Sequence, residues 1–333
     1  MIKNSTFMIT GGTGSFGQTM LRYLIKNNVK KVKVLSRDEK KQETLRLELK
    51  NNKIEFIIGD VRDIESIENH FSGVDYVFHA AALKQVPSCE FYPLEAIKTN
   101  ILGTQNVIKC SIKERIKSLV LLSTDKSVYP VNAMGMTKAL AEKLILSNVR
   151  MSGKTKLCIT RYGNVMGSRG SVIPLIINQI KNNLPITITD FEMTRFLMSL
   201  DDSIELVIKA FKDGKNGDIY VRKSPSVTIK TLVDALMQIF NTKSKIKIIG
   251  TRHGEKLFET LVSREELIRA KETKNFFSIR ADSRSINYDT YFSKGVQKLS
   301  NVVDYNSHNA KRLSVLETKK MLLGMDFIKK ELL

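Results

Sequence analysis

A group of side chains able to move protons stands near the middle of the chain. Thr124, Asp125 and Lys126 follow one another directly after an apolar run, and Lys138 comes shortly afterwards. A carboxyl group can donate a proton, an amine can accept one, and a hydroxyl can bond a substrate hydroxyl. The grouping therefore indicates acid–base catalysis. The alternative is that Asp125 and Lys126 form a solvated ion pair in a loop.

A glycine-rich loop near the start of the chain could bind phosphate. Three glycines are spaced Gly-x-x-Gly-x-x-Gly between an apolar run at residues 7–10 and a helical pattern at residues 16–26. Such glycines permit a tight turn, close approach of backbone N–H groups to a pyrophosphate, and close helix–strand packing. The helix N-terminus adds positive potential. The loop predicts a dinucleotide site formed by Gly11, Thr13, Gly14, Ser15, Phe16 and Gly17.

The residues after the second expected strand select the dinucleotide. NAD-binding proteins usually place an acidic residue there for the ribose hydroxyls. Here Arg37 follows the strand, with Lys40 or Lys41 behind it, and could bind a 2′-phosphate. Asp38 could instead cap the next helix. NADP is therefore expected rather than NAD, with Asp60 and Val61 at the adenine and Ala80, Ala81 and Ala82 at the nicotinamide-side ribose.

These groups need a scaffold, and the first half of the chain alternates strand and helix patterns. Short buried strands that alternate with helices indicate a parallel sheet covered on both faces. The predicted fold is a Rossmann-like, doubly wound α/β sheet, with residues 1–162 as the NADP-binding domain. Residues 163–333 would form mostly a smaller substrate-binding region and a tail. The expected strands are residues 7–10, 33–36, 55–59, 75–79, 118–123 and 156–160. Helices are expected from Asp63 to Phe71 and over residues 93–113.

Composition excludes several other classes of protein. The net charge is +20, but the lysines are scattered and no zinc-finger, homeodomain or RNA-recognition signature occurs, so we expect no nucleic-acid partner. No apolar run approaches the roughly 20 residues that span a bilayer, and the start of the chain does not read as a signal peptide. A cytoplasmic protein is expected. Cys89, Cys110 and Cys158 are expected to be buried thiols, and the four scattered histidines predict no metal site.

A resemblance to a known family rests on two stretches in the middle of the chain. Residues 122–127 read LSTDKS and residues 132–138 read NAMGMTK. They resemble the polysaccharide-biosynthesis branch of the extended short-chain dehydrogenase/reductases, which includes UDP-N-acetylglucosamine 4,6-dehydratases. The similarity continues through residues 193–196, 252–256 and 304–309, and so covers nearly the whole chain.

One position departs from the general pattern of that family. Most members have Tyr-x-x-x-Lys, whereas this chain has Met134 in the tyrosine place and Lys138 in the lysine place. This Met-x-x-x-Lys signature resembles the inverting 4,6-dehydratase/5-epimerases that begin UDP-N-acetyl-L-fucosamine synthesis. Tyr129 lies nine residues before Lys138 and cannot share its helical face. Lys126 or a water is left to replace the phenol in the first proton transfer.

The resemblance implies a reaction in which hydride leaves C4 of the sugar, water is lost across C5 and C6, and hydride returns to C6. Reprotonation at C5 from the opposite face inverts that carbon. Thr124 would bond the C4 hydroxyl, Asp125 would be the acid at C6, and Lys138 would hold the nicotinamide ribose. Lys126 would be the base at C5, with its pKa lowered by burial and by Lys138.

The resemblance also implies a UDP-sugar site and a homo-oligomer, a dimer or hexamer. Asn164 would bond the sugar or diphosphate, and two arginines would bind the diphosphate. Glu255 would bond a ribose hydroxyl or only pair with Lys256, and Lys84 would reach the substrate or lie on the surface. The expected substrate-side residues are Lys84, Asn164, Arg195, Arg252 and Glu255, and the expected substrate is UDP-N-acetylglucosamine or a related UDP-sugar.

Two other functions remain open from the sequence. A UDP-hexose 4-epimerase, acting on UDP-glucose or UDP-N-acetylglucosamine, shares the fold and the first hydride step. Such enzymes normally keep the tyrosine, and Lys126 has no assigned role in their reaction. A non-catalytic NADP-binding sensor would explain Met134, but Asp125, Lys126 and Lys138 together favour a working enzyme.

Overall fold

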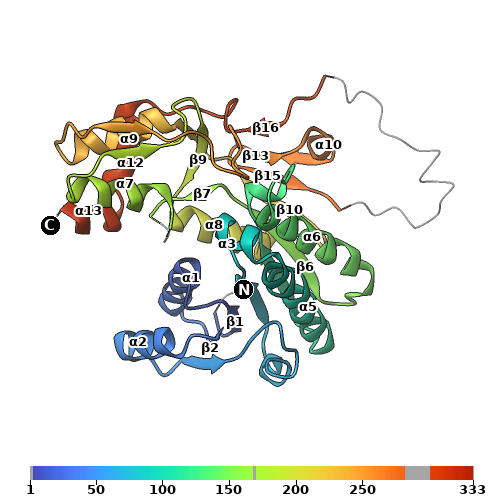
Figure 1. Ribbon diagram of the computed structural model, residues 1–333. Coiled ribbons are helices and arrows are strands. Elements are labelled where there is room, and N and C mark those ends of the chain that lie inside the picture. Colours follow the sequence, from blue (N-terminus) through green and yellow to red (C-terminus); the bar gives the residue numbers. More distant parts are fainter. Residues whose placement is uncertain (1–2, 168–169, 282–300, 333) are drawn as a thin grey trace.

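The computed structural model describes residues 3–167, 170–281 and 301–332. A central sheet carries helices on both faces, and a smaller lobe lies beyond the carboxyl ends of its strands (Figure 1). The expected Rossmann-like, doubly wound α/β fold is confirmed. Within the described residues, no helix combines the length and apolar character needed to cross a membrane.

The central sheet has nine strands in the order β14-β15-β10-β6-β5-β4-β1-β2-β3. Neighbouring strands from β3 to β10 pair in parallel, whereas β15 is antiparallel to both β10 and β14. The chain runs from β1 out to β3 and then returns to β4 beside β1, which creates a topological switch point. The strands are β1 Thr6–Thr10, β2 Lys31–Ser36, β3 Ile54–Ile58, β4 Tyr76–His79, β5 Ser118–Leu122, β6 Lys156–Arg161, β10 Ile219–Arg222, β14 Ala270–Glu272 and β15 Phe276–Ile279.

Successive residues of the inner strands face opposite sides of the sheet, and each side has its own apolar core. In β1, Met8 belongs to one core and both Phe7 and Ile9 to the other. The first core packs under α5 (Gly103–Lys113) and α6 (Ala133–Asn148), and the second packs under α1 (Ser15–Lys26) and α8 (Leu200–Asp213). Burial on both faces explains why these strands are apolar along their whole length.

Two helical predictions were wrong in detail. The helix expected from Asp63 is limited to the 3₁₀ turn η1 (Glu68–Phe71). The helix expected over residues 93–113 divides into α4 (Pro93–Ala96), the π-helix η2 (Ile97–Leu102) and α5. In η2, the side chain of Asn100 bonds the backbone of Leu83 and so fixes the chain after β4. The sequence did not predict α3 (Val86–Phe91). For α2 (Glu39–Leu49) it predicted only that Asp38 could be the cap.

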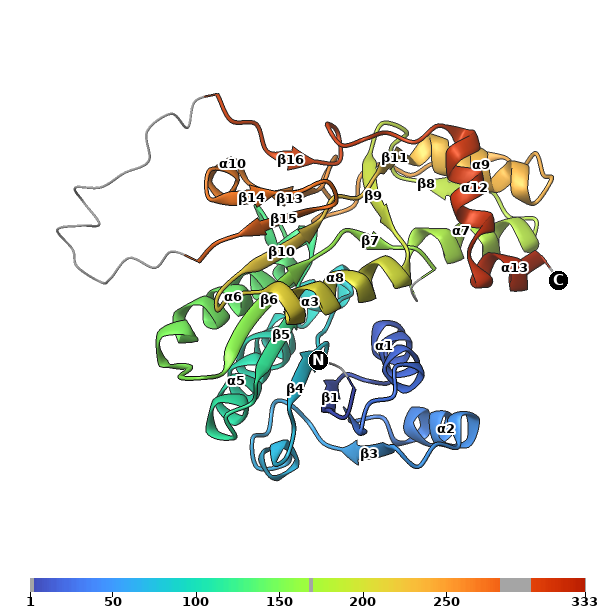
Figure 2. The ribbon, with the colours of Figure 1, turned by 180° about the vertical axis from the view of Figure 1, so that it is seen from behind.

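The smaller lobe has a third apolar core, formed only by residues from Met166 onward. Figure 2 shows it on the side of the molecule away from β3 and α2. The division expected at residue 162 does not coincide with an edge of the central sheet, because β10, β15 and β14 extend that sheet. The lobe contains β7 Asn164–Val165, β8 Ile186–Ile188, β9 Thr194–Met198, β11 Ser226–Thr228, β12 Ile246–Ile248, α7 Val172–Lys181, α9 Ile229–Ile239, α12 Val315–Leu323 and α13 Asp326–Leu332.

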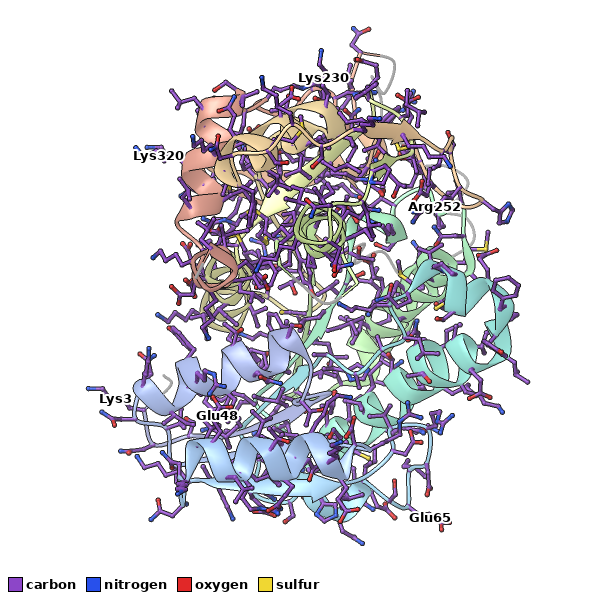
Figure 3. The ribbon with its side chains drawn as sticks, turned by 60° about the vertical axis from the view of Figure 1, so that its left-hand side comes forward. Lys3, Glu48, Glu65, Lys230, Arg252 and Lys320 are labelled. Atoms are coloured by element: carbon purple, nitrogen blue, oxygen red, sulfur yellow. The ribbon has the colours of Figure 1, made fainter. Side chains whose placement is uncertain are left out.

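The remaining described elements join the lobe to the central sheet. Strand β13 (Thr260–Val262) pairs with β16 (Tyr305–Asn306) and leads into α10 (Arg264–Leu267). Charged side chains are spread over the whole molecule, as Figure 3 shows for Lys3 and Glu48 at the end with α1 and α2 and for Lys320 on the opposite lobe.

Candidate active site

A cavity of about 1060 Å³ lies between the carboxyl ends of the central strands and the smaller lobe. Its wall comes from the loops that follow β1, β2, β4, β5 and β6 and from residues of the lobe. This is the switch-point position where doubly wound sheets bind ligands. The expected site residues on this wall are Gly11, Thr13, Gly14, Ser15, Phe16, Gly17, Arg37, Lys41, Ala80, Ala81, Lys84, Thr124, Asp125, Lys126, Lys138, Asn164, Arg195, Arg252 and Glu255.

The glycine loop has the backbone geometry that a pyrophosphate requires. Gly11 has a φ of +68°, and a Cβ there would lie 2.8 Å from the backbone of Ala81, so a larger residue could not fit. A Cβ on Gly17 would lie 2.5 Å from the Cα of Gly12, which confirms that the third glycine permits close helix–strand packing. Helix α1 begins at Ser15 without a side-chain cap, so its first N–H groups remain available to an anion.

The residues after β2 place a carboxyl group and a cation at the cavity. Asp38 accepts a hydrogen bond from the backbone N–H of Lys41 and its side chain also pairs with that of Lys41, so Asp38 is the N-cap of α2. Asp38 also lines the cavity. Arg37 is half exposed on the cavity wall and lies 3.5 Å from Asp60.

Asp60 and Val61 do not line the cavity, although Asp60 lies beside Arg37, and their expected contact with the adenine stays a prediction. The carboxylate of Asp60 accepts hydrogen bonds from the backbone and side chain of Arg62. Val61 is buried against α5, where a Cβ on Gly103 would lie 2.8 Å from its side chain. Both residues therefore fix the loop after β3 against its neighbours.

The stretch after β5 holds its carboxyl group and its amine in the cavity. The 3₁₀ turn η3 (Asp125–Ser127) begins after Thr124, whose hydroxyl caps it. Asp125 accepts a hydrogen bond from the Thr124 hydroxyl at 2.9 Å and from Lys126 Nζ at 3.1 Å. The Asp125 side chain is 1% exposed and that of Lys126 is 22% exposed, so this is not the solvated ion pair that the sequence left open.

Lys126 has a second partner that the sequence analysis missed. Glu259 Oε1 also lies 3.1 Å from Lys126 Nζ, and the Glu259 side chain is 3% exposed. Burial lowers the pKa of Lys126, but the carboxylates of Asp125 and Glu259 outweigh burial and hold that pKa above its ordinary value. The expectation of a lowered pKa was therefore wrong, because both carboxylates favour the ammonium form.

The two carboxyl groups differ in their environments. Burial raises the pKa of Asp125 even though Lys126 opposes the shift. Glu259 is also buried, but Lys126, Arg195 and Lys256 hold its pKa below the ordinary value. The two shifts thus move the pKa of Asp125 toward the protonated form and that of Glu259 toward the carboxylate form. One oxygen of each, Asp125 Oδ2 and Glu259 Oε2, has no hydrogen-bond partner among the described residues.

Met134 and Lys138 lie on one face of α6, and both side chains reach the cavity wall. Lys138 Nζ donates to the carbonyl oxygen of Leu122 at the end of β5. Burial lowers the pKa of Lys138 to about 8, although Glu142 opposes the shift. Met134 is 5% exposed and packs with Cys89 and Ala96, so the tyrosine place is filled by an apolar side chain.

Two tyrosines near the site differ in whether they reach the cavity. Tyr129 hydrogen-bonds Glu265 and Asp304 and is not on the cavity wall. Tyr162, which the sequence analysis did not single out, lines the cavity next to Asp125 and stacks on Phe16. Burial and Asp125 raise the pKa of Tyr162, so its hydroxyl keeps its proton.

The expected substrate-side residues face one another across the cavity from several elements. Arg195 projects from β9 and acts electrostatically on both Lys126 and Glu259. Asn164 has a buried side-chain oxygen without a partner among the described residues. Glu255 accepts a hydrogen bond from the backbone of Arg252. Lys256 bonds the carbonyl of Val128 and lies 3.6 Å from Glu259, so it does not supply the alternative pairing expected for Glu255.

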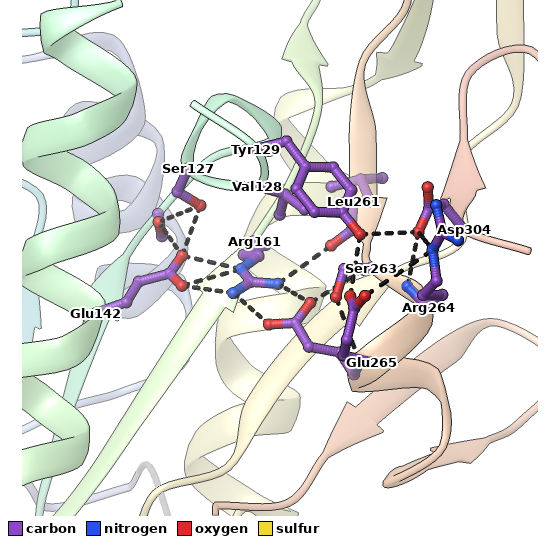
Figure 4. A network of polar contacts seen from close by, with 12 residues as sticks. Ser127, Val128, Tyr129, Glu142, Arg161, Leu261, Ser263, Arg264, Glu265 and Asp304 are labelled. Atoms are coloured by element: carbon purple, nitrogen blue, oxygen red, sulfur yellow. Dashed lines mark hydrogen bonds and ion pairs between the residues drawn. The ribbon is translucent and has the colours of Figure 1, made fainter. Parts of the chain in front are cut away.

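A buried ionic network connects the two sides of this site (Figure 4). Arg161, at the end of β6, bonds the carboxylates of Glu142 on α6 and Glu266 on α10. Glu142 also accepts hydrogen bonds from Ser123 and Ser127, which flank the catalytic stretch. The network therefore fixes residues 124–126 relative to the segment that carries Glu259.

The described histidines do not form a metal site. His79 is fully buried and bonds the hydroxyls of Thr10 and Thr104, and burial lowers its pKa to about 3, so it is a neutral structural residue. Across the described ranges, no three His, Cys, Asp or Glu side chains are grouped as metal ligands. All three cysteines are free and buried.

Comparison with known proteins shows the family to which the chain is related. Residues 7–281 match the family described as polysaccharide biosynthesis protein, and residues 282–329 match the polysaccharide biosynthesis protein C-terminal family. A protein of Rickettsia rickettsii (strain Sheila Smith) named UDP-glucose 4-epimerase is 55% identical over 338 aligned positions that cover 100% of this chain and 99% of that protein. A Rickettsia bellii (strain RML369-C) protein of the same name is also 55% identical, with the same coverage.

Solved structures show the same fold. The protein Pen from Bacillus thuringiensis is 37% identical, with a TM-score of 0.88 over 97% of this chain and 99% of that one. DesIV, a dTDP-glucose 4,6-dehydratase from Streptomyces venezuelae with NAD and TYD bound, is 22% identical, with a TM-score of 0.69 over 76% of this chain and 86% of that one. At that identity the second likeness supports the fold alone.

Proposed function

This chain belongs to the polysaccharide biosynthesis protein family, and we propose that it is a UDP-N-acetylglucosamine 4,6-dehydratase that inverts C5. The observation that carries the proposal is the buried pair of Asp125 and Lys126 at the carboxyl edge of the sheet. Loss of water across C5 and C6 needs a base and an acid beside the sugar. A raised pKa suits Asp125 to the role of the acid.

We propose that NADP is the cofactor. Gly11, the start of α1 and Lys138 supply contacts for the pyrophosphate and a ribose. Arg37 on the cavity wall, together with Asp38 turned to cap α2, supports a 2′-phosphate. A bound nicotinamide supplies reversible hydride transfer with the sugar, so the overall reaction requires no added oxidant.

The side chains of this cavity divide the remaining work. Thr124 bonds the C4 hydroxyl, and a water takes its proton, because Met134 has none to exchange and the ammonium of Lys126 cannot accept one. The resulting 4-ketone acidifies the C5 proton, which Lys126 removes. Asp125 gives a proton to the hydroxyl that leaves C6 as water. Arg195 and Arg252 bind the diphosphate, and Glu255 and Asn164 hold ribose and sugar hydroxyls.

A UDP-glucose 4-epimerase is the second candidate, and the names of the rickettsial relatives favour it. That reaction inverts C4 by removing a hydride and returning it to the same carbon. It needs one group to exchange the C4 hydroxyl proton, and it leaves C5 and C6 intact. The buried Asp125 and Lys126 would then have no separate acid and base roles, which is why we prefer the dehydratase.

We also propose that the protein forms a homo-oligomer, a dimer or a hexamer. Large apolar side chains are exposed on adjacent helices of the central domain: Phe91 at 81%, Tyr92 at 67% and Leu140 at 53%. Helices α3 and α4 contact α6, so these side chains belong to one region of the surface. Burial of such a patch stabilises association. Light scattering would distinguish a dimer or a hexamer from a monomer.

The proposed function is tested by the mass of the product. The purified protein is incubated with UDP-N-acetylglucosamine and NADP⁺, and the nucleotide sugars are analysed by mass spectrometry. A product lighter than the substrate by one water supports the dehydratase. A product of unchanged mass that is identified as UDP-N-acetylgalactosamine supports the epimerase. Cofactor binding without any turnover supports a non-catalytic binding protein.

A further inference from the structure

We propose that Glu259 is a third member of the catalytic group, and that it accepts the proton that Lys126 must lose before it can act as a base. The inference rests on the proposed dehydratase and deepens it. Lys126 Nζ lies 3.1 Å from Glu259 Oε1 and 3.1 Å from Asp125 Oδ1, so one ammonium group bridges two buried carboxyl groups.

Glu259 lines the same cavity as Lys126. Its side chain is 3% exposed, and its Oε2 has no hydrogen-bond partner among the described residues. A structural carboxylate at this depth would normally be fully hydrogen-bonded. Lys256 Nζ lies 3.6 Å from Oε2. Glu259 Oε2 is therefore an acceptor atom without a hydrogen bond from the described residues. The neighbouring cations nevertheless hold the pKa of Glu259 low, so a proton on Glu259 is held only until it returns to Lys126.

The resting charges explain why a third group is required. Both carboxyl neighbours favour the ammonium form of Lys126, and an ammonium cannot take a proton from carbon. Transfer of one proton from Lys126 to Glu259 produces a neutral amine and a neutral acid. This transfer leaves the net charge of the buried group unchanged, so the site does not have to admit a new isolated charge.

The proton balance of the elimination then closes within the three residues. The neutral Lys126 amine takes the C5 proton, the C5–C6 double bond forms as the C6–O bond breaks, and the Asp125 proton leaves with the hydroxyl as water. The ammonium of Lys126 next returns a proton to the Asp125 carboxylate and receives the proton held by Glu259. Asp125 is again protonated, Lys126 is again an ammonium, and Glu259 is again a carboxylate.

Deuterium exchange at C5 in Glu259→Gln tests this relay, with the exposed Glu265→Gln as a matched control outside the cavity. We expect wild type and Glu265→Gln to exchange C5 with solvent at similar rates and Glu259→Gln to exchange at least about 100-fold more slowly. Reduction of bound NADP⁺ on mixing with substrate should remain, because it precedes loss of the C5 proton. Glu259→Asp should recover part of the exchange.

The pH profile separates a relay from a merely structural role. In Glu259→Gln, Lys126 must lose its proton to solvent, so residual exchange should rise about tenfold per pH unit. Exchange within about threefold of wild type in Glu259→Gln would overturn the inference. So would slow exchange with an unchanged pH profile and no recovery in Glu259→Asp. If wild type itself exchanges no C5 proton, the proposed dehydratase fails and the relay fails with it.

Discussion

Arg161 Nε donates to both carboxylate oxygens of Glu142, at 2.9 Å and 3.1 Å. Both side chains are about 95% buried. The same Glu142 carboxylate accepts hydrogen bonds from Ser123 and Ser127, and the same guanidinium reaches Glu266 beyond β13. One ion pair thus ties the catalytic stretch after β5 to the segment that brings Glu259 into the cavity (Figure 4).

Replacement of Glu142 by Gln should destabilise the protein by about 3–5 kcal/mol at neutral pH, because Arg161 would lose a buried partner. Burial raises the pKa of Glu142, but Arg161 outweighs burial and holds the folded-state pKa below its ordinary value of 4.5. At pH values above 4.5, the charge of Glu142 therefore stabilises the fold. This contribution to the free energy of unfolding is lost as the pH falls through the lower folded-state pKa.

Urea unfolding of wild type and Glu142→Gln measures this difference as a function of pH. The gap in unfolding free energy should be full at neutral pH and should narrow in acid, where wild type also loses the charge. A gap under about 1 kcal/mol, or one equal at both pH values, would contradict a stabilising charge at Glu142.

Replacement of Lys126 by Ala should abolish exchange of the C5 proton with solvent while leaving NADP⁺ bound. Loss of a general base typically lowers a rate by about 10²–10⁴. Exchange is followed by NMR of UDP-N-acetylglucosamine in deuterated water. Lys113→Ala removes an exposed lysine that pairs with Glu68 and serves as the control. Exchange that survives in Lys126→Ala would remove its role as base.

Replacement of Met134 by Leu should keep turnover within about threefold of wild type, since Leu and Met have similar volumes and neither has a proton to exchange. The Met134 side chain is almost fully buried, so the change should be felt only as packing. Steady-state kinetics of the two proteins provide the measurement. A loss beyond about 100-fold would mean that the thioether does more than fill space.

Replacement of Arg37 by Ala should weaken binding of NADPH about 10- to 100-fold and leave binding of NADH nearly unchanged. Only NADPH has a 2′-phosphate, so only NADPH would lose a charge-assisted hydrogen bond to Arg37. The chain contains no Trp, so fluorescence of the bound nicotinamide can be read without a tryptophan background. Arg46→Ala, at an exposed site on α2 away from the cavity wall, is the control. Equal weakening of both dinucleotides would contradict a phosphate contact at Arg37.

The fold was predictable because its signals are local. The glycine spacing at residues 11–17 and the buried runs of β1 to β6 each lie within a few neighbouring residues. The cavity wall was largely predictable for the same reason, since parallel strands deliver the residues that follow them to one edge.

Glu259 and the ionisation of Lys126 could not be predicted in this way. Glu259 lies three residues beyond Lys256, which ends a run that resembles the family. Nothing in the neighbouring sequence indicates that Glu259 contacts the loop after β5. The pKa of Lys126 depends on that distant contact, so reasoning from burial and from Lys138 gave the wrong direction. Arg62 and Gly103 hold Asp60 and Val61 against neighbouring segments, and whether these two residues meet the adenine stays a prediction.

The configuration at C5 of the product tests the account most directly. UDP-N-acetylglucosamine is converted in deuterated water, and the product is examined by proton NMR for its coupling constants around the ring and for the C5 signal. We predict a 4-keto-6-deoxy sugar that carries deuterium at C5 in the inverted configuration. A product that retains its original hydrogen and configuration at C5, with only C4 inverted, would contradict the assignment of Asp125 and Lys126 as an acid and base for loss of water.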